Sequence, residues 1–212
     1  MFTVIQKRTG RIKGYYNGEK HPSHREEILL FMFFLAGLLL GAIAVRKNSS
    51  LLSVRLLSLF ENYSIVKSGQ SAAINFCNAL FKQLILLLST FCIGLCAVGM
   101  PFLFLITLGY GTSVGIVSAF LYKTYMLKGI GYCALILYPG VILTAAALVF
   151  ACSAGMQMSR FLMNGLLIRE SEKQETFRQY CLRFLAAEAV CICAALAETA
   201  LYAVFSGYFQ FS

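Results

Sequence analysis

The chain has 212 residues and a net charge of +9, with 59% apolar and only 13% charged residues. Soluble domains carry about 25% charged residues, and from Leu84 to Ser159 this chain has no acid and only two basic residues, Lys123 and Lys128. This composition excludes a soluble globular protein and predicts an all-α polytopic membrane helical bundle. The basic residues are scattered around apolar stretches, so we expect them to meet the headgroups of a lipid bilayer, and no nucleic acid.

The N-terminal residues 1–27 are polar and basic, and we expect them to form a cytoplasmic segment ahead of the first span, 28–45. Ala42-Ile43-Ala44 has the A-x-A form of a signal-peptide cleavage site. The polar lead is long, however, and the apolar stretch exceeds the usual signal core of about 7–15 residues. Both properties favour an uncleaved helix, on which Gly37 and Gly41 form a small-residue face suited to close packing.

Residues 46–83 form a sizeable segment between spans, and we expect them on the outer side of the membrane. Within it, Leu52, Leu56 and Leu59 recur at helical spacing among polar residues, which predicts an interfacial amphipathic helix. Such a helix lies either along the membrane surface or against its own bundle. The sequence leaves both arrangements open.

Three further spans are expected inside or beside the charge-poor run. Pro101 separates the first two, because proline cannot continue the helical hydrogen-bond ladder but can start the next helix. Gly111 and Gly115 repeat the four-residue spacing of a packing face. Pro139 leaves a backbone carbonyl free inside the membrane, which predicts a kink. The expected spans are 84–98, 102–121 and 130–156.

The fifth predicted span, 184–205, follows a polar inner segment, 157–183, that we expect outside the bilayer. Small residues recur every four positions from Ala187 to Ala203. Such a stripe lets another backbone approach closely. It predicts a packing face, directed either into the bundle or toward a partner.

Glu188 and Glu198 are the only acids within the predicted spans. Ten residues apart on a helix, they point in directions roughly 80° different, so they do not form an acid–base couple. Glu188 lies near one end of its span, where Arg178 or Arg183 can pair with it. Glu198 is deeper and is either a proton or cation relay or a protonated structural acid. The lack of a second deep acid favours the structural role.

The distribution of basic residues predicts the orientation of the chain in the membrane. With the N-terminus inside, the segments 1–27 and 157–183 place eleven of the 18 Lys and Arg residues in the cytoplasm, and seven lie outside. An excess of basic residues marks the cytoplasmic side. We therefore expect a single five-span membrane domain, 28–212, in the cell membrane, with a cytoplasmic N-terminus and an extracytoplasmic C-terminus.

The sequence contains no recognisable catalytic or cofactor motif, since P-loop, HExxH, GxSxG and Rossmann patterns are all absent. Most of the eight cysteines lie in apolar spans without a CxxC pair, which favours small apolar side chains over a metal or disulfide framework. We therefore expect no enzyme, and no catalytic, cofactor-binding or metal-binding residue.

Several short motifs follow one another in a recognisable order. They are Phe76-Cys77-Asn78, Gly94 followed by Gly99-Met100-Pro101, Gly111 with Gly115, Leu137-Tyr138-Pro139-Gly140, Ala154-Gly155-Met156 and, in the last span, Leu196-Ala197-Glu198. This order resembles the stage II sporulation protein M family of small bacterial membrane proteins. The fourth span departs from the family pattern, because Tyr138-Pro139-Gly140 stands where many relatives have a more polar group followed by an acid.

The resemblance implies a non-enzymatic integral membrane scaffold of the engulfment machinery during endospore formation. The implied partners are membrane-anchored peptidoglycan hydrolases at the septal membrane, namely a lytic transglycosylase and an amidase/endopeptidase. The motif positions that carry over as structural or partner-contact candidates are Asn78, Pro101, Gly111, Gly115, Pro139 and Glu198.

Two other functions remain to be weighed against the scaffold. A permease-like transport subunit, with a path near Pro139 and Glu198, is the alternative. Transporters coupled to ions usually carry charges in several spans or an inverted repeat, and neither is evident here. An intramembrane enzyme is disfavoured because the chain lacks a nucleophile–base pair.

Overall fold

The computed structural model describes residues 24–47, 71–164 and 170–205. No strand occurs among these residues, and five of their helical stretches are long and apolar enough to cross a membrane. The predicted all-α polytopic bundle is confirmed. In chain order the helices are α2 (His24–Lys47), α4 (Ala72–Gly94), α5 (Met100–Tyr132), the π-helix η1 (Cys133–Leu137), α6 (Tyr138–Asn164) and α7 (Glu170–Phe205).

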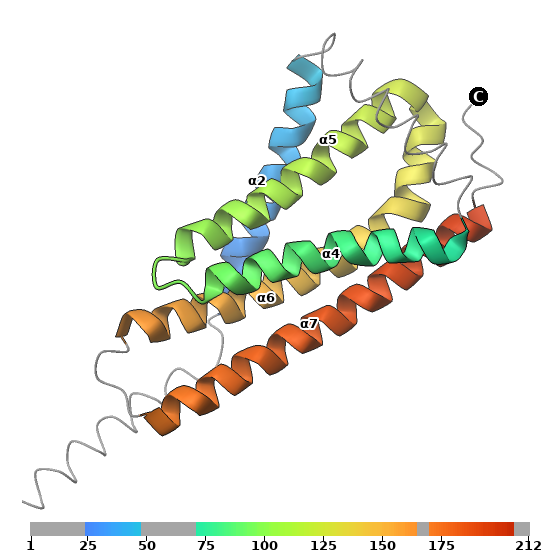
Figure 1. Cartoon of the computed structure of the whole chain (residues 1–212). Helices are drawn as coiled ribbons and strands as arrows, with labels where there is room; N and C mark the ends of the chain where they lie inside the picture. Colours follow the sequence, from blue (N-terminus) through green and yellow to red (C-terminus); the bar gives the residue numbers. More distant parts are fainter. Residues whose placement is uncertain (1–23, 48–70, 165–169, 206–212) are drawn as a thin grey trace, which may run out of the picture.

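The helices cross the bundle in alternating directions (Figure 1). The starts of α2, α5 and α7 lie at one end together with the ends of α4 and α6, and we call this the His24 end. The opposite end, which holds the end of α2 and the start of α4, is called the Lys47 end. Five crossings therefore place the two ends of the described chain at opposite ends of the bundle.

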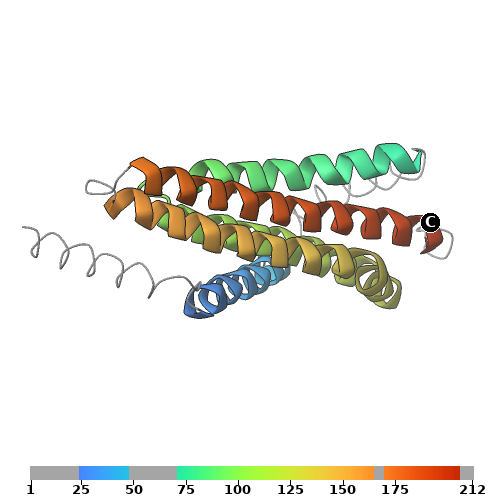
Figure 2. The ribbon, with the colours of Figure 1, turned by 90° about the horizontal axis from the view of Figure 1, so that it is seen from below.

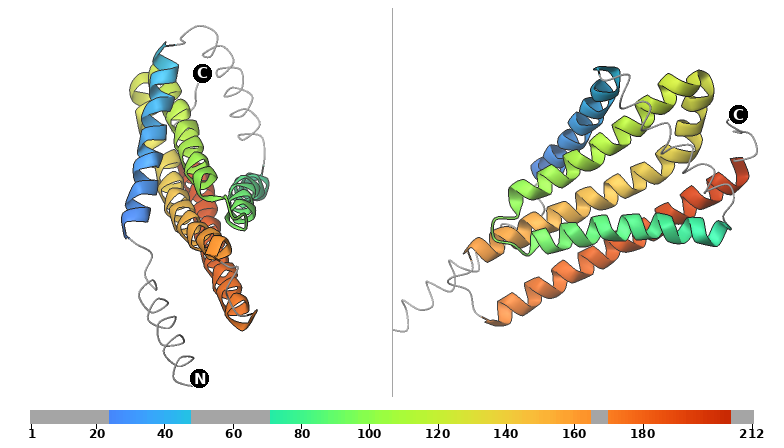
Figure 3. Two further views of the ribbon diagram at one scale, coloured as in Figure 1. Left: turned by 90° about the vertical axis from the view of Figure 1, so that its left-hand side faces the viewer. Right: turned by 45° about the horizontal axis from the view of Figure 1, so that its top comes forward.

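Helix α6 is central to this arrangement, because it contacts α2, α4, α5 and α7. Helices α2 and α5 form the most extensive pair, and α4 packs against both α6 and α7. Viewed from below, α2 and α4 lie on opposite sides of the bundle (Figure 2). The end-on view in Figure 3 likewise puts α2 at one edge and α4 at another. The core therefore forms around α6.

Several helices extend beyond the predicted spans. Helix α4 begins at Ala72, well before the apolar run 84–98, and ends earlier, at Gly94. The polar segment 157–183 is largely helical, because α6 continues to Asn164 and α7 begins at Glu170. Helix α7 contains neither proline nor glycine, so nothing stops it where the apolar sequence ends. The predicted amphipathic helix falls mainly on residues 48–70, outside the described residues.

The turn after the third span is made at Met126, where φ is 47° and ψ is −124°. A positive φ is uncommon for any residue other than glycine and costs on the order of 1–3 kcal/mol. The break lies between Lys123 and Lys128, the two basic residues of the charge-poor run. At Gly129 an added Cβ would clash with the carbonyl oxygen of Leu121, so the chain folds back tightly onto the end of the span.

An irregular helical turn lies where the sequence predicts a kink. The π-helix η1 ends at Leu137, two residues before Pro139, and α6 then continues as a regular α-helix. Proline has no backbone N–H and clashes with the carbonyl of the preceding turn of an α-helix. A wider π turn relieves that clash. The local geometry thus follows from the proline.

Glycines bring α2 and α5 into backbone contact. Gly37 and Gly41 of α2 face α5, while Gly111 and Gly115 of α5 face α2, and an added Cβ at any of them would clash with a carbonyl oxygen of the other helix. The opposing carbonyls are those of Leu108 for Gly37, Thr112 for Gly41, Phe34 for Gly111 and Leu38 for Gly115. Two four-residue glycine repeats therefore pack on each other, as in a parallel pair of membrane helices.

The small-residue stripe of α7 faces the bundle over most of its length. Ala187, Cys191 and Ala195 are all buried, whereas Ala203 is exposed. Ala187 and Cys191 pack in a cluster with three alanines of α6, which are Ala147, Ala151 and Ala154. Of the two directions that the sequence left open, this part of the stripe points inward.

Polar contacts join the helices at the His24 end. The Ser159 hydroxyl of α6 lies 2.9 Å from the carbonyl oxygen of Cys96 and 3.1 Å from that of Ala97, in the turn between α4 and α5. The Tyr180 hydroxyl of α7 donates to the Phe91 carbonyl of α4 at 2.9 Å. Two side-chain pairs complete the set: Arg160 with Glu26, and Arg183 with Gln157.

Replacing Gly111 by leucine should separate α2 from α5, because the side chain has no space against the Phe34 carbonyl. We expect a loss of about 1–3 kcal/mol or more in the free energy of unfolding, measured as a lower thermal midpoint in detergent. Gly109 is the matched control, since an added Cβ there meets nothing within 4 Å. Equal destabilisation by Gly109→Leu and Gly111→Leu would contradict the backbone contact.

Candidate functional site

The six predicted site residues lie in different parts of the bundle. Pro101 is exposed in the first turn of α5, at the His24 end, and Asn78 is exposed on α4, toward the Lys47 end. Gly111 and Gly115 are buried against α2. Pro139 lies next to Gly140, which faces Glu198 of α7. Among the six predicted residues, only Pro139 and Glu198 are brought near each other from two different helices.

Glu198 packs against the start of α6. An added Cβ on Gly140 would lie 3.4 Å from the Cβ of Glu198 and 3.8 Å from its carboxylate oxygen Oε2. The side chain of Glu198 is half-buried. The Glu198 side chain therefore packs against α6 at Gly140, one residue after the proline.

A second set of polar side chains extends this site across the bundle. Gln83 of α4 donates from Nε2 to the Oγ1 atom of Thr144 at 3.2 Å, and Thr144 donates to the Gly140 carbonyl at 2.9 Å. Tyr110 of α5 lies within hydrogen-bonding reach of Thr144 and within electrostatic range of Glu198. Four helices thus contribute to one polar cluster, which consists of Gln83, Tyr110, Thr144 and Glu198.

Two of the four members of the polar cluster are buried, and Tyr110 and Glu198 are half-buried. Thr144 is 3% exposed and Gln83 is 9% exposed. The Oε1 atom of Gln83 is buried and has no hydrogen-bond partner among the described residues. In hydrocarbon an unpaired polar group is costly, so hydrogen bonds between helices stabilise the bundle. The cluster can therefore hold four helices together.

Reasoning from the sequence identified Glu198 and Pro139 but missed Gln83, Tyr110 and Thr144. Gln83 falls one residue before the predicted span 84–98, whereas Tyr110 and Thr144 are single polar side chains within apolar spans. A glutamine at the edge of an apolar run was the available signal, because α4 carries it into the membrane, where its amide must be satisfied. Which helices meet there depends on the tertiary packing, and no short pattern encodes it.

Glu188 does not join this cluster. It lies half-buried on α7, ten residues before Glu198. In the described part of the chain, no group of three or more His, Cys, Asp and Glu side chains lies close enough together to hold a metal ion. The polar cluster is therefore a site to which four of the described helices each contribute a polar side chain.

A match to one known protein family covers most of this bundle. A model of the family described as stage II sporulation protein M matches residues 30–201. The chain belongs to that family. No curated protein and no solved structure matches the chain.

The family match includes the polar cluster and at least part of each of the five helical spans. It begins within α2 and ends within α7. The motifs on which the resemblance was based lay between Phe76 and Glu198, so the match also takes in the first helix. The chain is therefore a membrane protein of the stage II sporulation protein M family, with five apolar helices.

Replacing Thr144 by valine should destabilise the bundle, because Nε2 of Gln83 would lose its acceptor in an apolar environment. We expect a loss of about 1 kcal/mol in the free energy of unfolding, measured by thermal or denaturant unfolding in detergent. The double variant Gln83→Leu/Thr144→Val removes both partners and should be more stable than Thr144→Val alone.

Thr199→Val is the control for this pair, since the Thr199 hydroxyl donates to the carbonyl of Ala195 in its own helix, at 2.8 Å, and joins no second helix among the described residues. It should change stability less than Thr144→Val does. Strictly additive effects of the Gln83 and Thr144 substitutions would show that their hydrogen bond contributes nothing.

Proposed function

We propose that this protein is a non-enzymatic membrane scaffold of the sporulation engulfment machinery, which localises peptidoglycan hydrolases at the septal membrane. The observation that carries the proposal is the family match across residues 30–201, which includes at least part of every helical span. The partners would be membrane-anchored hydrolases, a lytic transglycosylase and an amidase/endopeptidase. Tethering would act by raising the effective concentration of these enzymes at one patch of membrane.

The packing of the bundle supports a scaffold. The α2–α5 glycine contact and the alanine-rich α6–α7 contact bring helices together at close range. Apolar side chains also point outward, where they can meet lipid or the membrane anchor of a partner. On α4 these are Phe81, Leu84, Ile85 and Leu88, and on α7 they include Leu182, Leu185 and Leu196.

The orientation of the chain decides which compartment each partner would meet. We propose a cytoplasmic His24 end, which puts the Lys47 end, where α2 ends and α4 begins, on the side where peptidoglycan lies. The excess of basic residues in 1–27 and 157–183 supports this orientation. A scaffold for cell-wall enzymes needs an extramembrane surface on that side.

A reporter fused after Ser212 tests the orientation. Alkaline phosphatase is active only outside the cytoplasm, where its disulfides form, so a fusion at this position should be active. Green fluorescent protein, which is fluorescent in the cytoplasm, should be dark at the same position. The same two reporters fused after Lys128 serve as the control and should give the same result. Fluorescence without phosphatase activity at Ser212 would show that this end of the chain is cytoplasmic, opposite to the proposed orientation.

A permease-like subunit is the second candidate function, because Glu198, Pro139 and the polar cluster lie together between the helices. Discontinuous or kinked helices and intramembrane carboxyl groups are typical of transport paths. Here the π-helix η1 precedes Pro139, and the Glu198 side chain packs against Gly140. We rank this function second because Glu188 and Glu198 both lie on α7, whereas ion-coupled transporters usually carry intramembrane charges on several helices.

Co-purification from sporulating cells separates the two candidates. The tagged protein should recover cell-wall hydrolases, and Glu198→Gln should leave their yield unchanged, because a scaffold does not need an exchangeable proton. Asn78→Ala, on the exposed face of α4, should lower the yield, whereas Ile142→Ala, at an exposed position of α6, is the control and should leave the yield unchanged. If Glu198→Gln instead abolishes proton-dependent uptake into vesicles, the permease function is the correct one.

A further inference from the structure

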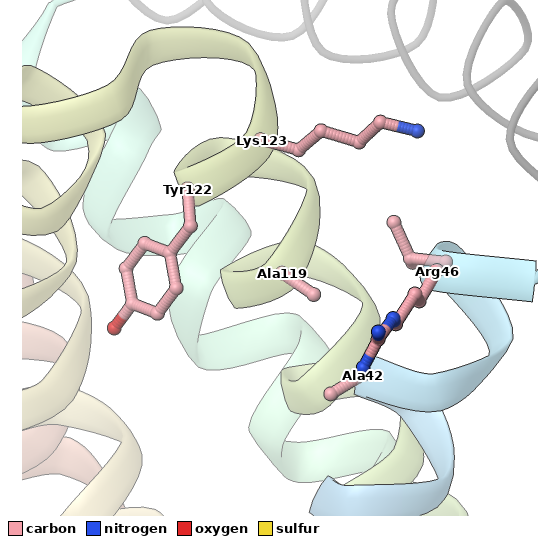
Figure 4. Close-up of a pocket in the computed structure, with 6 residues that line it drawn as sticks. Ala42, Arg46, Ala119, Tyr122 and Lys123 are labelled. Carbon is pink, nitrogen blue, oxygen red and sulfur yellow. The ribbon is translucent and has the colours of Figure 1, made fainter.

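A recess at the Lys47 end lies between α2 and α5, apart from the polar cluster (Figure 4). The two helices touch at their glycine repeats and separate toward this end (Figure 1). Ala42 and Ala119 come after the glycines and are too small to fill the widening space. The recess has a volume of about 560 Å³ and is lined by Ala42, Val45, Arg46, Ala119, Tyr122 and Lys123.

The recess combines an apolar floor with two cationic side chains. Arg46 comes from α2 and Lys123 from α5, and both are exposed. Figure 4 shows Lys123 reaching from its helix toward the end of α2 that carries Arg46. Within the part of the chain that the structure describes, neither side chain forms an ion pair. Two cations facing the same recess favour an anionic occupant.

One wall of the recess is held in place by a hydrogen bond. The hydroxyl group of Tyr122 lies 2.5 Å from that of Tyr138, which joins α5 to the start of α6. Val45 is only 4% exposed and forms part of the floor. The recess is thus bounded by fixed side chains, and its two charged residues are free to move toward a ligand.

The position of the recess identifies the kind of ligand. The apolar stretch of α2 ends at Lys47, and the third span ends near Leu127, so Arg46 and Lys123 lie at the level of the lipid headgroups. We propose that the recess binds one anionic glycerophospholipid, with its phosphate between Arg46 and Lys123 and its glycerol and upper acyl chains on the alanine floor. Arginine pairs bidentately with phosphate, while lysine adds a mobile positive charge.

Native mass spectrometry of the full-length protein, released from an equal mixture of phosphatidylglycerol and phosphatidylcholine, tests this site. The wild type should retain phosphatidylglycerol preferentially. Arg46→Gln/Lys123→Gln should lower that preference on the order of tenfold, because two cations near the headgroups are lost. Lys47→Gln removes a charge next to the recess but not in its lining, so it is the matched control and should keep the preference.

A second variant tests whether the shape of the recess contributes to lipid binding as well as its charge. Ala119→Leu keeps both cations but fills the floor, and it should also lower the retention of phosphatidylglycerol. Thermal midpoints in phosphatidylcholine nanodiscs verify that each variant is folded. If Ala119→Leu does not fold, the comparison of Arg46→Gln/Lys123→Gln with Lys47→Gln still tests the proposal. Inorganic phosphate alone should not stabilise the protein in those nanodiscs.

Three results would overturn the proposal. The first is a double charge variant that retains phosphatidylglycerol as the wild type does. The second is a Lys47→Gln variant that loses as much preference as the double variant, which would indicate general surface charge. The third is stabilisation by inorganic phosphate alone, which would indicate a phosphate site in which the lipid chains take no part.

Discussion

Helices surrounded by hydrocarbon gain nothing from burying one more apolar side chain against each other, because lipid tails are equally apolar. Close approach of backbones, with its dense van der Waals contacts, must supply the association instead. In this protein the requirement is met by two glycine repeats, Gly37 with Gly41 and Gly111 with Gly115, whose positions leave no space even for a methyl group. The position of α2 in the bundle depends on that contact.

The other helices depend on two further kinds of contact. Alanines of α6 pack against small residues of α7. Hydroxyl, amide and guanidinium groups form hydrogen bonds between the helices. Polar bonds of this kind have a direction, so they fix how one helix is rotated and shifted along another. The glycine and alanine faces let the helices approach closely, and the polar groups determine how each helix is aligned along its neighbour.

The sequence was sufficient for features that depend on local pattern. The number of apolar spans, both glycine faces and the irregular turn near Pro139 could all be predicted, because each follows from spacing or from the chemistry of one residue. Pairings between distant residues could not be predicted. Nothing near Gln83 indicates Thr144, and nothing near Gly37 indicates Leu108. Helix ends were also missed, because a helix continues into polar sequence until a residue stops it, as α7 shows.

Helix α7 has a mechanical consequence. Its 36 residues form one uninterrupted helix, which at a rise of 1.5 Å per residue is about 54 Å long, whereas the hydrocarbon core is about 30 Å thick. A single rod therefore crosses the membrane and projects beyond it, without a proline or glycine at which to bend. The polar first turns of α7 and the turn at which Glu198 meets α6 therefore belong to one continuous helix, so neither can be repositioned independently of the other.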